Sequence, residues 1–145
     1  MRLHALVDGL ALETATGTRL EPHQGQALFA GTTDAALAHA GPWLIDTHEA
    51  APELLKTLID LEPAHPVVSW LFTPLQPVAL TRALQSMLDA RLPDGRRVLI
   101  RFYDPRVLPK LLKVMTVDQH KQFFHSIHEW RSLDRDGQYR AIARP

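Results

Sequence analysis

Val67-Val68-Ser69-Trp70-Leu71-Phe72 is the densest apolar run in the chain, and apolar side chains fall on both of its alternating faces. A strand with this pattern usually lies inside a sheet that is covered on both sides. The run is also far shorter than the roughly 20 residues that a membrane-spanning helix needs. It therefore predicts an interior strand of a sheet.

Strand and helix patterns alternate before this run. The strand patterns have suitable lengths and apolar content, and they cover Leu3–Asp8, Gln26–Ala30 and Trp43–Asp46. A short helix capped by Thr32 or Thr33 is expected to run to His39, before Gly41-Pro42. Pro52 then begins a helix whose leucines recur at helical spacing.

The same alternation continues after the run. A helix is expected from Pro77, a strand over Arg96–Asp104 and a further helix from Pro105. Thr116 and Gln119 have the spacing of a capping box at the start of another helix. Two strand patterns predict a C-terminal hairpin, and they cover Ile127–Leu133 and Gln138–Ala143.

These patterns predict one α/β (α+β) domain over residues 1–145, with a mixed sheet of about five to seven strands and flanking helices. The composition, 46% hydrophobic and 22% charged, is typical of a globular protein. The lack of cysteine excludes a disulfide framework, a thiolate zinc site and a cysteine nucleophile. With neither a secretory signal nor a membrane span in the sequence, we expect a cytoplasmic protein.

The net charge is zero, but the two halves of the chain carry opposite charge. Residues 1–74 contain three basic and nine acidic side chains, a net charge of −6. Residues 75–145 contain thirteen basic and seven acidic side chains, a net charge of +6. Such a division can steer a charged partner, or it can be satisfied when the two halves pack together.

The segment from Arg96 to Val107 is the most informative about function. Alternation along a strand would place one set of side chains in the core, namely Val98, Ile100 and Phe102. The opposite face would offer hydrogen-bonding groups to a partner, and it carries Arg97, Leu99, Arg101 and Tyr103.

The end of this segment has two explanations. Asp104 can cap the helix that Pro105 begins, which leaves Arg106 in the first turn, where a cation gains nothing from the helix dipole. Either these charged residues contact a partner, or Arg101 or Arg106 pairs with Asp104 or Asp46 inside the domain.

Trp130 also has two explanations. It lies between Glu129 and Arg131. It is either an exposed anchor of the kind common at protein interfaces or a hairpin residue that covers the sheet.

No motif predicts catalysis or a cofactor. The densest histidine group contains His120, His125 and His128, followed by Glu129, but it lacks an H-E-x-x-H signature. The nucleophile elbow and both glycine-rich phosphate motifs are absent as well. We therefore expect neither a metal site nor an enzyme.

A single-stranded nucleic-acid-binding module in the basic second half is the alternative function. Arginines interleaved with Phe102 and Tyr103 are typical of some single-strand binders. However, the chain is neutral overall and Phe102 is expected in the core, so nucleic acid is a less favoured partner than protein.

Several blocks of sequence resemble a known family. They occur in the order His4–Gly9, Leu28–Thr32, Ala40–Asp46, Arg91–Arg96 and Arg101–Val107. Together they resemble the type VI secretion effector adaptors, or chaperones, a family formerly described as a domain of unknown function and encoded beside VgrG spike proteins. The resemblance extends from Leu3 to Tyr139. Some members of that family continue into a C-terminal helical region, so this chain would use the α/β domain alone or be a truncated form.

The resemblance implies a non-catalytic adaptor that binds a cognate effector, through the effector's N-terminal region, and helps load it onto VgrG. The VgrG C-terminal region is a second expected partner. The residues expected to hold the fold are Asp8, Gly41, Pro42, Trp43, Asp46, Phe102 and Pro105. The residues expected to bind a partner are Arg97, Arg101, Tyr103, Asp104, Arg106 and Trp130.

Overall fold

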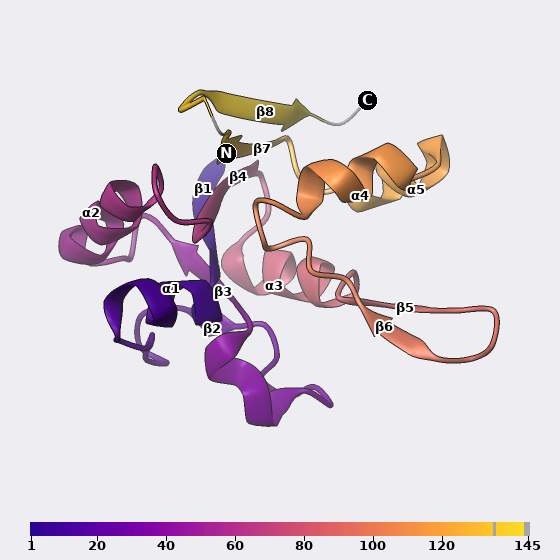
Figure 1. The fold of residues 1–145 in the computed structure, drawn as a ribbon, viewed down its shortest axis with the longest axis horizontal. Coiled ribbons are helices and arrows are strands. Elements are labelled where there is room, and N and C mark those ends of the chain that lie inside the picture. The colour runs from indigo at the N-terminus through magenta and orange to yellow at the C-terminus, as the bar shows by residue number, and fades with distance from the viewer. Residues whose placement is uncertain (135, 144–145) are drawn as a thin grey trace.

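The computed structural model describes residues 1–134 and 136–143, and its centre is a six-stranded sheet with the strand order β2-β3-β1-β4-β7-β8 (Figure 1). The strands are β1 (Arg2–Asp8), β2 (Gln26–Ala27), β3 (Pro42–Asp46), β4 (Val68–Thr73), β7 (Glu129–Leu133) and β8 (Tyr139–Ala143). A separate two-stranded ribbon is formed by β5 (Asp89–Arg91) and β6 (Arg97–Leu99). The α/β fold class is therefore as expected.

Every strand pairing in the described part of the chain is antiparallel, which corrects the expectation of a mixed sheet. The expectation came from helices between strands, which usually connect parallel neighbours. Such a connection does exist between β3 and β4, which run in the same direction. However, β1 lies between them and pairs antiparallel with both, so no parallel neighbours result.

Helices cover both faces of the sheet. They are α1 (Gly9–Thr16), the 3₁₀ helix η1 (Ala35–Ala40), α2 (Pro52–Leu61), α3 (Pro77–Gln85), α4 (Leu108–Val114) and α5 (Val117–Phe123). In Figure 1, α1 and α2 lie on one side of the sheet, whereas α3, α4 and α5 lie on the other. Within the described residues, none of these helices has the length and apolar character needed to cross a bilayer.

Two apolar cores follow from the alternation of side chains along β1. Leu6 belongs to the core under α3, α4 and α5, whereas Ala5 and Val7 belong to the core under α1 and α2. In β4, Leu71 and Val68 divide between the two cores in the same way. The interior strand predicted from residues 67–72 is confirmed.

Local differences from the predicted elements have visible causes. The strand predicted over Gln26–Ala30 stops after two residues. The Thr32 hydroxyl donates to the Phe29 carbonyl at 2.6 Å and accepts from the Asp34 N–H at 3.1 Å, which turns the chain. The C-terminal hairpin and the capping box of α5 are confirmed. Arg135, within the predicted hairpin turn, lies outside the described residues.

Candidate protein-binding site

The segment predicted as a strand over Arg96–Asp104 is a short strand followed by a turn. Strand β6 ends at Leu99, and the Ile100 N–H donates to the Leu88 carbonyl at 2.6 Å. The Asp104 N–H then donates to the Arg101 carbonyl at 3.1 Å. The prediction that Tyr103 faces a partner is therefore wrong, because the turn buries Phe102 and Tyr103 together.

The buried aromatic residues of this turn join a larger aromatic cluster. The Phe102 ring lies 5.5 Å from the Phe123 ring and 5.9 Å from the Trp130 ring, in edge-to-face contacts. Trp130 is 0% exposed and stacks on Phe123. Trp130 therefore covers the sheet, and the alternative in which it is an exposed anchor is wrong. Phe102 lies in the core, as its position in the pattern suggested.

The charged residues of the turn surround two buried carboxylates. Arg106 makes a two-point contact with Asp104, at 2.9 Å from Nη2 and 3.1 Å from Nε. The half-exposed Arg101 places Nη2 3.6 Å from Asp8 Oδ2 and 3.9 Å from Asp104 Oδ2. Arg101 and Arg106 thus pair inside the domain, with Asp8 and Asp104; Asp46 pairs instead with Arg2.

The two buried carboxylates differ in pKa. Burial raises the pKa of Asp8, although the Ala11 N–H and Arg101 oppose it. Burial also acts to raise the pKa of Asp104, but hydrogen bonds from Arg106 outweigh it, so the pKa of Asp104 is lowered. Unequal carboxylates are found in active sites. Here, however, Asp8 caps α1 and Asp104 accepts from the Arg106 N–H at 2.9 Å, which are structural roles.

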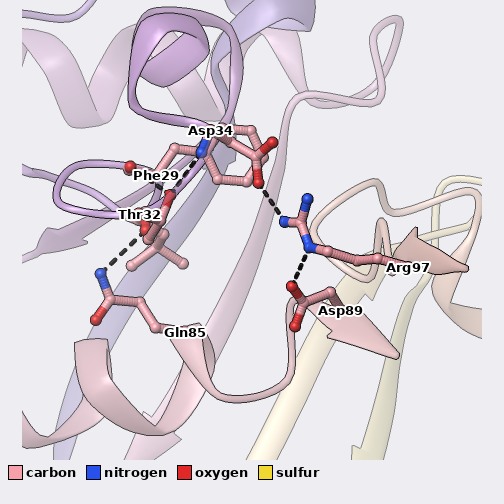
Figure 2. A network of polar contacts seen from close by, with 7 residues as sticks. Phe29, Thr32, Asp34, Gln85, Asp89 and Arg97 are labelled. Atoms are coloured by element: carbon pink, nitrogen blue, oxygen red, sulfur yellow. Dashed lines mark hydrogen bonds and ion pairs between the residues drawn. The ribbon is translucent and has the colours of Figure 1, made fainter. Parts of the chain in front are cut away.

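Arg97 fastens the β5–β6 ribbon to the first half of the chain. Its guanidinium pairs with Asp34 in the loop before η1 and with Asp89 at the start of β5 (Figure 2). Nearby, the Gln85 side-chain amide donates to the Leu28 carbonyl at 3.0 Å. The Arg97 side chain, predicted to bind a partner, is therefore engaged in an internal network.

The Gly41-Pro42 block packs beside the Arg101–Arg106 turn. A Cβ on Gly41 would overlap the ring of Phe29, and Phe29 contacts Tyr103 edge-on at 6.4 Å between ring centres. Pro42 pairs with Asp8 in the sheet register. Trp43 is buried, and its indole N–H donates to the His39 carbonyl at 3.3 Å. Two motif blocks far apart in sequence thus meet at the end of β1.

An apolar groove of about 780 Å³ lies on the helical layer that contains α3, α4 and α5. One wall is the C-terminal end of α3 with β5, and the other is α4 with α5. Its apolar lining includes Met87, Ile100, Leu111, Val114, Met115 and Ile127. A groove of this volume and character is suited to binding apolar side chains of a partner.

The sequence patterns did not identify this groove. The sequence did contain a signal for it. Between Val107 and Val117, apolar residues lie on several sides of the helical pattern, whereas a helix that only packs on a core needs them on one side. Val114 is 77% exposed and Val117 is 68% exposed. Excess apolar residues on a short helical segment are the feature that would have indicated an exposed binding surface.

The histidine group does not form a shared helical face. Helix α5 ends at Phe123, and Glu129 begins β7, so His125 and Glu129 are not one helical turn apart. Within residues 1–134 and 136–143, no group of three or more His, Cys, Asp or Glu side chains is arranged to hold a metal ion. His120 packs edge-on against Phe124, with ring centres 4.8 Å apart.

Comparison with known proteins gives one match. No curated protein and no solved structure matches the chain. Residues 3–122, which include the Arg101–Arg106 turn and most of the residues that line the groove, match a family described as "Domain of unknown function (DUF4123)". The match spans most of the chain, and the chain therefore belongs to the DUF4123 family.

Proposed function

We propose that this protein is a non-catalytic adaptor of type VI secretion, which binds a cognate effector in the cytoplasm and helps load it onto the VgrG spike. The sequence blocks that resemble effector adaptors support this function, and all five lie within the family match over residues 3–122. The effector's N-terminal region is the proposed client segment, with the VgrG C-terminal region as a second partner.

The observation that carries the proposal is the exposed apolar groove. An open, largely apolar groove of about 780 Å³ offers more apolar surface than isolated exposed side chains do. Such a surface is typical of sites that bind another protein or an apolar ligand. An adaptor needs this kind of surface and needs no catalytic residues.

The arrangement of the arginines favours a protein partner over single-stranded nucleic acid. Arg97, Arg101 and Arg106 contact carboxylates of the chain itself. Phe102 and Tyr103, the aromatic residues needed for base stacking, are buried. The basic segment therefore lacks the exposed stacking platform that single-strand binders use.

Co-expression of the chain with the proteins encoded beside its gene tests the proposal. We expect a stoichiometric complex with a neighbouring toxin or VgrG protein after affinity capture and size exclusion. Elution of the chain alone, with soluble and folded neighbours, would contradict the adaptor function. Salt-dependent retention on a single-stranded oligonucleotide would then favour the alternative.

A further inference from the structure

We propose that the groove binds one amphipathic helix of the client protein, with an apolar face seated in the groove and acidic residues along its flanks. This inference rests on the proposed adaptor function and specifies what the client must present. Three features of the groove lead to it: its apolar walls, the state of the backbone in those walls, and the charge around it.

The walls present apolar side chains that can adapt to an inserted helix. Met87 stands on one side and Met115 on the other, and these are two of the three methionines in the chain. Methionine is flexible and polarisable, and it is common on surfaces that accommodate varied apolar partners. Ile100 and Ile127 add branched apolar surface to the lining.

The backbone of the walls favours a helical occupant over an extended one. The α4–α5 wall and the α3 end of the other wall are helical, so most of their backbone groups are already hydrogen-bonded within the helices, and β5 in the second wall pairs with β6. A strand lying in an apolar groove would leave many of its own N–H and C=O groups without partners, which is costly. A helix satisfies these groups internally and offers side chains at i, i+3, i+4 and i+7 to the groove.

The charge on the elements that form the groove favours a client helix with acidic residues along its flanks. On α3, β5, α4 and α5, six charged Asp, Glu, Lys or Arg side chains have no ion pair within the described part of the chain. Five are basic and one is acidic, and they are Arg82, Arg91, Lys110, Lys113, Lys121 and Asp118. Lys121 itself lines the groove, whereas the lining carboxylate of Asp89 is already paired with Arg97. Complementary charge of this kind orients a partner and speeds its association.

The Arg97 network keeps one wall of the groove in place. Asp89 lines the groove and is held by Arg97, which is also held by Asp34 across the chain (Figure 2). The groove is therefore formed before a partner arrives, and less ordering is needed on binding.

Fluorescence anisotropy with designed peptides tests the inference on the full chain. The probe is a labelled amphipathic helical peptide with a leucine and methionine face and glutamate flanks. Its matched controls are the same peptide with lysine flanks and a version with proline at its centre. We expect the acidic peptide to bind, and both controls to bind at least about tenfold more weakly.

Two variants of the chain locate the binding. Val114→Glu puts a carboxylate on a 77% exposed groove residue, and Lys121→Glu reverses the lining cation. Each variant is expected to bind the acidic peptide about tenfold more weakly, or weaker still. Ile59→Glu is the matched control, because Ile59 is an exposed apolar residue of α2, on the opposite layer. Thermal unfolding by circular dichroism verifies that all three variants fold.

The outcomes separate this inference from the adaptor function. Equal affinity for the acidic, basic and proline peptides, no binding of any of them, or equal loss with Ile59→Glu would overturn the helix-in-groove inference. A client captured from the neighbouring genes that binds Val114→Glu as well as it binds the original chain would also overturn it, while leaving the adaptor function intact. Peptide binding with the expected pattern, but no captured neighbour, would support the groove and contradict the proposed client.

Discussion

At the end of β1, side chains from three parts of the sequence meet. Asp8 caps α1, Arg101 lies between Asp8 and Asp104, and Arg106 holds Asp104 by two contacts. Gly41 leaves room for the Phe29 ring beside them. The charged residues among the blocks that resemble the family therefore hold the fold together. Their spacing in the sequence had left open whether they do this or contact a partner.

We predict that the two carboxylates titrate on opposite sides of their ordinary value. The pKa of Asp8 is raised above 3.8, chiefly by burial, and the pKa of Asp104 is lowered below 3.8 because hydrogen bonds from Arg106 outweigh burial. The stability contributed by Asp104 is therefore present above pH 3.8 and is lost as the pH falls through its lowered pKa. Carboxyl-carbon NMR titration measures both values.

The Arg106→Ala variant isolates the cause of this difference. It is expected to raise the pKa of Asp104, whereas Lys110→Ala, which removes a cation that has no ion pair in the described part of the chain, is expected to leave it unchanged. Titration of Asp104 above Asp8 in the original chain would contradict the assignment.

The core position of Phe102 gives a stability prediction. Phe102 is 0% exposed and contacts three other aromatic rings. Phe102→Ala is expected to lower the free energy of unfolding by about 3–5 kcal/mol, through lost burial and a cavity. Urea denaturation measures the loss, with Leu99→Ala at a 39% exposed position as the control. A loss for Phe102→Ala no larger than that of the control would contradict the core assignment.

At the scale of single elements, the continuous apolar run of β4 and the helical stripe of α3 were predictable, whereas the alternating pattern of the Arg96–Asp104 segment was misleading. The interior strand near Val68 and the helix from Pro77 were readable because their patterns persist over several residues. The pattern over Arg96–Asp104 alternates like a strand, yet the chain turns after Leu99. Contacts of Phe102 with rings from distant elements decide that turn, and no local pattern contains them.

The β5–β6 ribbon gives a prediction at this scale. Arg97→Ala removes the ion pairs to Asp34 and Asp89, so the ribbon should open more often while the main sheet is unaffected. Hydrogen exchange is expected to be faster at the Ile100 amide and in β6 but unchanged in β4. Arg96→Ala is the matched control, because Arg96 pairs only with Asp94 in its own turn among the described residues. Equal exchange in the two variants would contradict the anchoring role of Arg97.

For the whole molecule, the opposite charges of the two halves are partly satisfied internally. Arg97 pairs with Asp34 and Arg101 pairs with Asp8, and each pair joins the basic half to the acidic half. On α3, β5, α4 and α5, the elements that form the groove, five cations have no ion pair among the described residues, and one of them, Lys121, lines the groove. Sequence totals gave the division of charge, but only the three-dimensional arrangement separates the paired cations from the unpaired ones.

The buried His4 predicts how the stability of the whole domain depends on pH. His4 is 0% exposed, and neither ring nitrogen has a hydrogen-bond partner among the described residues. Burial, opposed by Asp46, lowers the pKa of His4 below 6.5. The unfolded chain therefore binds this proton more readily, so stability is lost as the pH falls from about 6.5 through the lowered pKa, by at most about 1.4 kcal/mol per pH unit.

Urea denaturation between pH 7.5 and pH 5 measures this dependence. The His4→Leu variant is expected to have a flatter profile over this interval, whereas His23→Gln at an exposed position is expected to keep the original profile. A His4→Leu profile as steep as that of the original chain would assign the pH dependence to other groups.

The central claim is that the chain binds a client protein through its apolar groove. The most direct test is capture of the co-expressed neighbouring effector by the original chain, by Val114→Glu and by the control Ile59→Glu, measured side by side. The account predicts a stoichiometric complex with the original chain and the control, and at least about tenfold less effector with Val114→Glu. Equal capture by all three chains, or capture by none, would contradict it.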